Sequence, residues 1–298
     1  MRRFPLLALS LILPLLAAEG AAAQASRSVV AMTLTQTDYG GGRVYLPMRF
    51  GNVAGAMRLD TGATTTRLRR APWNKDFPIV GQSRSTGAFG QTTLCEDVEA
   101  ANVALKASEG NDIARGKYEV ARCAADDGDD LLGLDFFKNA RFTMDFVRRE
   151  MVFFGPPFGG NPRPFRRLGP EKRLVGVDFR SGALTVIGLF DTGAEICAVD
   201  RAFVLKHRRL FAPTKERIGA SEASGRKFAS RLFKIKEIDL GAGRIARDVY
   251  ALVYDFGPLR AALGRETSFI LGFNLLSQFA WELDFRAADA PLWDARGK

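Results

Sequence analysis

Residues 188–194 read GLFDTGA, and the last four of these letters also stand at residues 60–63. Each copy ends a segment, 43–60 or 174–191, in which apolar residues alternate as in a strand interrupted by one turn. Glycine permits the backbone geometry of a tight turn. Asp60 and Asp191 are therefore predicted to lie on equivalent turns, each at the end of a strand.

The repeat extends well beyond these turns. The segment LLGLDFFKNARFTMDF, residues 131–146, aligns without a gap with ILGFNLLSQFAWELDF, residues 270–285. Between the turn and this segment each half carries a polar stretch with two glycines six positions apart, GQSRSTGAFG from residue 81 and GASEASGRKF from residue 219. Each half is thus predicted to contain strands, the DTGA turn, a hairpin, further strands, an apolar-apolar-glycine turn, a short helix and a final strand.

A segment rich in proline and glycine separates the two halves. Residues 155–170, GPPFGGNPRPFRRLGP, are predicted to be a linker without regular structure. The lobes would then span residues 27–154 and 171–298. Each lobe is small for an independent core, so we expect the two to pack against each other.

The first residues have the composition of a targeting segment. Arg2 and Arg3 precede an apolar run, and small residues follow it, which predicts a secretory signal peptide at residues 1–23, cleaved after Ala23 or Ala25. An uncleaved anchor is the alternative. We expect an exported protein, periplasmic or secreted, without a stable membrane anchor after cleavage.

Charge and composition restrict the classes of function. The net charge is +10, with arginine and lysine scattered along the chain. Such a surface favours acidic partners, but we prefer a solvated basic face, and no nucleic-acid-binding motif is present. Apolar residues form 47% of the chain, which is ordinary for a globular protein.

Histidine and cysteine are too few for several kinds of site. His207 is the only histidine, and we expect it on a surface helix, which excludes a multi-histidine zinc site. Cys95 and Cys123 could form a disulfide, while Cys197 is predicted to be a buried apolar residue. A calcium site is conceivable at four clustered aspartates, although a solvated acidic loop fits their spacing better: Asp126, Asp127, Asp129 and Asp130. We predict no metal and no cofactor.

Two carboxylates brought face to face by a pseudo-twofold axis have a defined chemistry. Like charges that close cannot both ionise, so the pair of Asp60 and Asp191 would share one proton. The ionised carboxylate can act as a base on water while the protonated one donates to a carbonyl oxygen. Asp135, Asp145 and Asp284 are predicted to cap helices or lie on the surface instead.

These motifs resemble those of retropepsin-like aspartic proteases (clan AA), in an exported bacterial form with two fused lobes. The resemblance rests on the doubled DTGA, the doubled apolar-apolar-glycine turns at Gly133 and Gly272, and the helix and strand after each. It covers nearly the whole chain after the signal peptide. It implies an all-β fold of two pseudo-symmetric β-barrel lobes with a short helix each, and an active site between them.

The resemblance also implies a role for particular residues. Asp60 and Asp191 would be catalytic, and Thr61 and Thr192 would interlock the two loops. Gly62, Ala63, Gly193 and Ala194 would support the dyad and contact substrate backbone. The flap candidates are Thr86, Gly87, Ala88, Phe89, Ser224 and Gly225. The expected partner is an extended peptide or an unfolded or loop segment of a protein, bound in strand conformation. The protein itself is expected to be a monomer.

The sequence departs from the retroviral pattern in one respect. Retroviral enzymes usually carry an arginine after the conserved glycine, paired with an acid after DTGA, but here Leu134 and Phe273 follow the glycines, and Thr64 and Glu195 follow the alanines. This predicts that the arginine–acid brace is absent. The alternative function is a catalytically silent pseudo-protease that binds peptides or acts as a scaffold.

Overall fold

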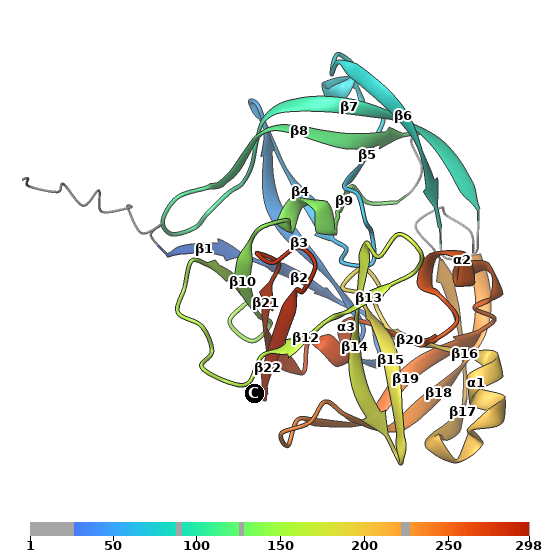
Figure 1. Cartoon of the computed structure of the whole chain (residues 1–298). Helices are drawn as coiled ribbons and strands as arrows, with labels where there is room; N and C mark the ends of the chain where they lie inside the picture. Colours follow the sequence, from blue (N-terminus) through green and yellow to red (C-terminus); the bar gives the residue numbers. More distant parts are fainter. Residues whose placement is uncertain (1–26, 88–90, 125–127, 222–226, 298) are drawn as a thin grey trace, which may run out of the picture.

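The computed structural model describes residues 27–87, 91–124, 128–221 and 227–297. Two lobes, each built on an eight-stranded sheet, are joined by a six-stranded sheet (Figure 1). Strands dominate and helices are few and short, so the prediction of an all-β, two-lobed fold is confirmed. Among the described helices, none is long and apolar enough to cross a membrane.

The sheet of the first lobe holds the first DTGA turn. The strand β4 ends one residue before Asp60, and β9 runs parallel beside it, with Leu59 opposite Leu132. In sheet order the strands are β2 (Thr33–Gln36), β3 (Gly42–Phe50), β4 (Val53–Leu59), β9 (Leu131–Leu132), β5 (Arg67–Arg69), β8 (Ile113–Cys123), β7 (Thr92–Leu105) and β6 (Ile79–Thr86).

The sheet of the second lobe repeats this arrangement. Here β15 ends one residue before Asp191 and pairs in parallel with β20, with Phe190 opposite Leu271. The strands, in sheet order, are β13 (Arg166–Leu168), β14 (Leu174–Ser181), β15 (Leu184–Phe190), β20 (Thr267–Leu271), β16 (Cys197–Asp200), β19 (Ile245–Tyr254), β18 (Lys227–Asp239) and β17 (Phe211–Ser221).

The six-stranded sheet takes strands from both lobes. The final strands of the two repeats, β10 and β21, lie next to each other and run antiparallel, with Phe142 opposite Leu283. In order the strands are β1 (Ser28–Ala31), β11 (Glu150–Phe153), β10 (Arg141–Asp145), β21 (Phe279–Asp284), β22 (Leu292–Gly297) and β12 (Arg163–Pro164). Large side chains of this sheet, such as those of Trp281 and Trp293, are buried. They belong to one hydrophobic core that includes residues of both lobes.

The segment between the lobes is more ordered than its composition predicts. Within residues 155–170 the structure has β12 and β13, so the expectation of no regular structure is wrong. Phe165 lies between the two strands, buried, and its ring stacks on Phe285 with the centroids 5.8 Å apart. Pro164 lies on the edge strand of its sheet, where a missing N–H group removes no sheet hydrogen bond.

The described helices are single turns or little more. The turn after Gly133 is a 3-10 helix and the one after Gly272 is an α-helix, so the two lobes differ there. The α-helices are α1 (Arg201–Lys206), α2 (Arg260–Leu263) and α3 (Phe273–Leu276). The 3-10 helices are η1 (Asp38–Gly40), η2 (Pro72–Asn74), η3 (Leu134–Phe137), η4 (Arg208–Leu210) and η5 (Gly257–Leu259).

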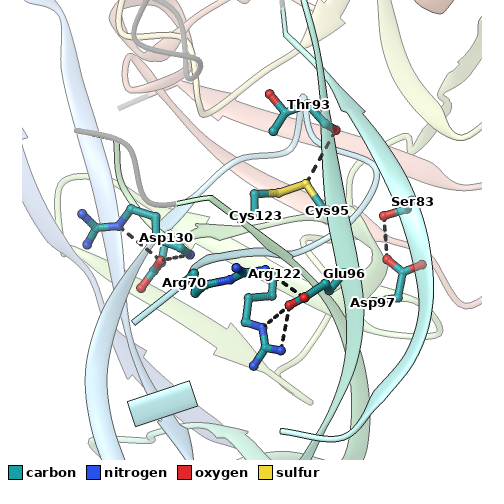
Figure 2. The surroundings of a disulfide bond; sticks show 10 residues. Arg70, Ser83, Thr93, Cys95, Glu96, Asp97, Arg122, Cys123 and Asp130 are labelled. Carbon is teal, nitrogen blue, oxygen red and sulfur yellow. Dashed lines mark hydrogen bonds and ion pairs between the residues drawn. A yellow bond between two sulfur atoms is a disulfide. The ribbon is translucent and has the colours of Figure 1, made fainter. Parts of the chain in front are cut away.

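A disulfide links two neighbouring strands of the first lobe. Cys95 on β7 is bonded to Cys123 at the end of β8 (Figure 2). Cys197 is a free, buried thiol. Beside the disulfide, the guanidinium of Arg122 pairs with Glu96 at 2.7 Å. The pairing that the sequence left open is thus present, and it fastens the strand that continues into the first hairpin.

Candidate active site

Equivalent strand pairs hold the two aspartates in equivalent places. The backbone N–H of Asp60 donates to the carbonyl of Leu132 at 3.0 Å, and that of Asp191 donates to Leu271 at 3.1 Å. In both lobes the aspartate is therefore the first residue after the strand that pairs in parallel, β4 with β9 and β15 with β20. The buried residues before them, Leu59 and Phe190, anchor the strand ends in the lobe cores.

Each turn holds its own carboxylate. The N–H of Gly62 donates to Asp60 Oδ1 at 2.9 Å, and the N–H of Gly193 donates to Asp191 Oδ1 at 2.8 Å. In the second lobe Ala194 adds a further N–H to the same oxygen at 3.1 Å. Backbone donors thus fix the orientation of both carboxylates before any ligand binds.

The two loops interlock through their threonines. Thr61 Oγ1 donates to the carbonyl of Phe190 at 2.8 Å, and Thr192 Oγ1 donates to Leu59 at 3.0 Å. Each hydroxyl also accepts the backbone N–H of the other threonine, at 3.1 and 3.0 Å. Both side chains are buried. The four hydrogen bonds join residues of opposite lobes, so the loops are held together by a network closed to water.

The glycines show that the carboxylates lie side by side across the lobe boundary. A methyl group added at Gly62 would lie 2.6 Å from the carboxylate of Asp191, and one added at Gly193 would overlap that of Asp60. Each glycine therefore packs against the carboxylate of the opposite lobe. This contact requires glycine for space and not for backbone geometry, because neither glycine has a φ in the left-handed region.

Burial and mutual repulsion favour protonation of the pair. Burial raises the pKa of Asp191 to about 8, and the negative charge of Asp60 acts in the same direction. Burial also raises the pKa of Asp60, while the positive charge of Arg58 and the Gly62 N–H oppose that rise. At neutral pH such a pair holds one proton, as the sequence predicts for two close carboxylates.

Comparison with known proteins identifies the fold. Neither a search of protein-family models nor a search of curated protein sequences finds a match. Among solved structures, basic 7S globulin from soybean matches with a TM-score of 0.54 and 12% identity over 91% of this chain and 95% of that chain. An aspartic proteinase from Irpex lacteus matches with a TM-score of 0.51 and 14% identity over 92% and 98%. The chain has an aspartic-protease fold. At this identity the likeness shows the fold and not the activity.

The glycine of each apolar-apolar-glycine turn donates a hydrogen bond to a side chain that follows the DTGA loop of the same lobe. The N–H of Gly133 donates to Thr66 Oγ1 at 3.1 Å, and that of Gly272 donates to Cys197 Sγ at 3.3 Å. Thr66 and Cys197 each lie six residues after an aspartate of the pair. Burial raises the pKa of the Cys197 thiol to about 12, which keeps it neutral and confirms that it is a buried structural residue.

Asp135 and Asn274 are structural residues in the same places of the two lobes. Asp135 Oδ1 accepts the N–H and the hydroxyl of Thr66, both at 2.9 Å. Asn274 Oδ1 accepts the N–H of Cys197 at 2.9 Å. The prediction that Asp135 caps a helix or lies on the surface is therefore wrong, because its carboxylate faces inward and braces the strand after the turn.

Two arginines that the sequence did not single out lie beside the pair, in contact with Asp129 and Glu195. Arg43 on β3 donates to Glu195 Oε1 at 2.7 Å, and Arg58 on β4 lies 3.4 Å from Asp129 Oδ2 and 3.8 Å from Glu195 Oε1. Glu195 belongs to the second lobe and the other three residues to the first. The arginine that retroviral enzymes carry after the conserved glycine is absent, but the acid after the second DTGA is paired all the same, because arginines of the opposite lobe supply the partner.

The hairpins expected to be flaps are present up to their tips. Thr86 ends β6 opposite Thr92, and the N–H of Gly87 donates to Gln91 at 2.9 Å. In the second lobe β17 and β18 pair as far as Ser221 and Lys227. Four flap candidates lie outside the described residues: Ala88, Phe89, Ser224 and Gly225. The flap function stays a prediction.

The histidine and the clustered aspartates, where the structure describes them, contact neighbouring protein groups. His207 follows α1, and its ring lies 4.5 Å from that of Phe203. Asp130 accepts the N–H of Arg69, and Asp129 pairs with arginines, whereas Asp126 and Asp127 lie outside the described residues. Within the part of the chain that the structure describes, no group of histidine, cysteine, aspartate and glutamate could hold a metal ion.

Proposed function

We propose that the protein is an aspartic endopeptidase in which Asp60 and Asp191 activate water against a peptide bond. The observation that carries this proposal is the packing of each glycine of the two loops against the carboxylate of the other lobe, which puts the two carboxylates side by side. The interlocked threonines and the raised pKa of Asp191 fit the same chemistry. Two intact, symmetric loops argue against a pseudo-protease.

The reaction needs one ionised and one protonated carboxylate. The ionised carboxylate takes a proton from water while the water oxygen forms a bond to the carbonyl carbon of the substrate, and the protonated carboxylate gives its proton to the carbonyl oxygen. When the tetrahedral intermediate collapses, the carboxyl that took the proton from water gives it to the amide nitrogen, the other carboxylate takes a proton from a hydroxyl of the diol, and the C–N bond breaks. The carboxylates end with one proton between them, ready for another cycle.

The substrate class follows from the two hairpins. A peptide in strand conformation binds through main-chain hydrogen bonds, and β6–β7 and β17–β18 would close over it. Within aspartic proteases we assign the chain to the retropepsin-like type, in an exported bacterial form acting as a monomer. The doubled DTGA with its matching glycine turns supports this assignment, as does the Arg43–Glu195 pair across the lobes.

Export to the periplasm or beyond is part of the proposal. The composition of residues 1–23 supports it, and so does the Cys95–Cys123 disulfide, because such bonds persist in oxidising compartments. Fractionation of expressing cells and N-terminal sequencing test this directly. A mature chain that retains residues 1–23 in the cytoplasm would overturn it.

The test of catalysis compares residues 24–298 with Asp60→Asn and Asp191→Asn. Each is incubated with an unfolded protein from acidic to neutral pH, with and without a hydroxyl-containing peptide that mimics the tetrahedral intermediate. Either substitution should lower cleavage by about 10²–10⁴-fold, the usual contribution of a general acid or base. Asp145→Asn is the matched control, because Asp145 caps a turn through the N–H groups of Val147 and Arg148. If all four proteins are folded and inert, the peptide-binding alternative replaces the enzyme.

A further inference from the structure

Arg58 breaks the symmetry of the site. It lies two residues before Asp60 on β4, and its side chain is 16% exposed, whereas Leu59 beside it is buried in the lobe core. The equivalent position before Asp191 is Leu189, which is buried among apolar residues. A positive charge therefore accompanies one loop of the pair and has no counterpart in the other.

The contacts of Arg58 reach the loop of the opposite lobe. Its Nη2 donates to the carbonyl of Gly193 at 2.5 Å. Gly193 is the residue whose Cα packs against the carboxylate of Asp60. Asp129 and Glu195, at 3.4 and 3.8 Å, hold the guanidinium in this position. One side chain thus touches the second loop at the point where that loop meets the first aspartate.

We propose that Arg58 is a positioning residue that ties the second loop to the first lobe and makes Asp60 the ionised member of the pair, with Asp191 the protonated one. In the reaction above, Asp60 then takes the proton from water and Asp191 donates to the carbonyl oxygen. This inference rests on the proposed function and assigns the two roles that the symmetric motifs leave equal.

The charges around the pair agree with this assignment. Burial raises the pKa of Asp60, and the strongest influence against that rise is Arg58. At Asp191 burial is the largest influence and the charge of Asp60 adds to it, so both raise the pKa. The N–H groups of Gly193 and Ala194, and then the cation of Arg58, act in the opposite direction. Other titratable or charged groups packed around the loops are Arg43 and Tyr45 on β3, Asp129 before β9, Asp135 beside Thr66, Arg173 beside Thr65, Glu195 after β15 and Cys197 on β16. Arg43 and Arg58 are balanced by Asp129 and Glu195.

The experiment separates this electrostatic role from a merely structural one. We would measure kcat/KM against pH for the wild type, Arg58→Met and Arg58→Lys. Loss of the cation should move the acidic limb of the profile to higher pH, because Asp60 then keeps its proton more tightly, and Arg58→Lys should leave the limb in place. If Arg58 were only structural, kcat/KM would fall by the same factor at every pH, and the proposal would be wrong.

Arg141→Met is the matched control. Arg141 is 19% exposed, pairs with Glu282 at 3.1 Å and donates to the carbonyl of Gly155, so it resembles Arg58 in burial and in partners. It lies in the six-stranded sheet on β10 and does not contact the loops. Its substitution should leave the acidic limb unmoved. If Arg58→Met does not fold, Arg58→Gln removes the same charge and keeps a donor for Gly193.

A second measurement does not depend on turnover. In protein labelled with ¹³C at the aspartate carboxyl carbon, NMR titration shows which carboxyl is ionised, with Asp60→Asn and Asp191→Asn used for assignment. We expect the Asp60 signal at the position of a carboxylate at pH 6 and that of Asp191 at the position of an acid. The opposite order, or equal titration in wild type and Arg58→Met, overturns the inference. If the wild type cuts no peptide, the proposed function fails while this titration still decides the role of Arg58.

Discussion

Thr61 and Thr192 donate their hydroxyl hydrogens into each other's lobe and accept each other's backbone N–H. Because both threonines are buried, water cannot replace a hydrogen bond that is lost. The position of the second carboxylate relative to the first therefore depends on two hydroxyl groups. The same four hydrogen bonds therefore stabilise the contact between the lobes and fix the geometry of the site.

Thr61→Val and Thr192→Val should each destabilise the protein. Valine keeps the shape of threonine but removes one donor and one acceptor, and leaves a buried N–H and a carbonyl of the other lobe without partners. The expected loss is about 2–6 kcal/mol in the free energy of unfolding, since each of the two unsatisfied buried polar groups costs about 1–3 kcal/mol. Urea unfolding measures it. Thr61→Ser, which keeps the hydroxyl, is the control, and an equal loss in the serine variant would contradict the explanation.

The carboxylate pair should make the protein less stable as the pH rises. In the folded state burial raises the pKa of Asp191 to about 8, so the folded state binds its proton more tightly than the unfolded state does. Below the pKa of an unfolded aspartate, about 3.9, both states are protonated and no penalty exists. Between that value and the folded pKa, the free energy of unfolding falls with rising pH.

Asp191→Asn should remove most of this dependence. Asparagine cannot ionise, and its oxygen can still accept the N–H of Gly193. We expect the variant to be more stable than the wild type at pH 7 by about 1–2 kcal/mol, the usual scale of a stabilising substitution. Melting temperatures between pH 4 and pH 8 test this, with Asp145→Asn as the comparison. If the melting temperatures of wild type and Asp191→Asn change with pH in parallel, burial does not raise the pKa of Asp191 and the prediction is wrong.

The disulfide should contribute to the stability of the first lobe. Replacing Cys95 and Cys123 by serine should lower the free energy of unfolding by about 3.6 kcal/mol, the value for closing a loop of this length in the unfolded chain. Reductant should then have no further effect on the double variant. Thiol titration of the denatured wild type should find one thiol, from Cys197, before reduction and three after it. A larger count before reduction would mean that the bond does not form.

The sequence predicts the parts of this molecule that depend on repetition. The doubled DTGA and the gapless match of residues 131–146 with 270–285 are visible in one chain, and the all-β, two-lobed fold follows from them. The short strands β12 and β13 were missed because proline and glycine dominate that segment. What orders it includes the buried Phe165, whose contacts with Phe285 and Trp293 join distant parts of the chain, and the buried Leu168.

The charged residues beside the site could not be predicted in the same way. Arg43, Arg58 and Glu195 are ordinary letters in their segments, and the C-terminal half has Leu189 where the first half has Arg58. A search for repeats passes over a residue present in one copy alone. A possible signal was the arginine within an otherwise apolar strand just before Asp60, since a charge at that place requires partners. The partners, Glu195 and the carbonyl of Gly193, become visible only when the lobes are packed.

Gly193→Ala should separate the requirement for space from the requirement for turn geometry. The φ of Gly193 does not lie in the left-handed region, so alanine is acceptable to the backbone, but its methyl group would overlap the carboxylate of Asp60. That carboxylate must move, and displacement of a catalytic group by about 1 Å costs about a hundredfold in rate. We therefore expect kcat/KM to fall by about a hundredfold in a protein whose circular dichroism spectrum is unchanged. Gly55→Ala, on the same strand as Arg58 and with no atom within 4 Å of the added methyl group, should retain full activity. Equal activity of the two variants would mean that the carboxylates are not in contact with the opposite loop in solution.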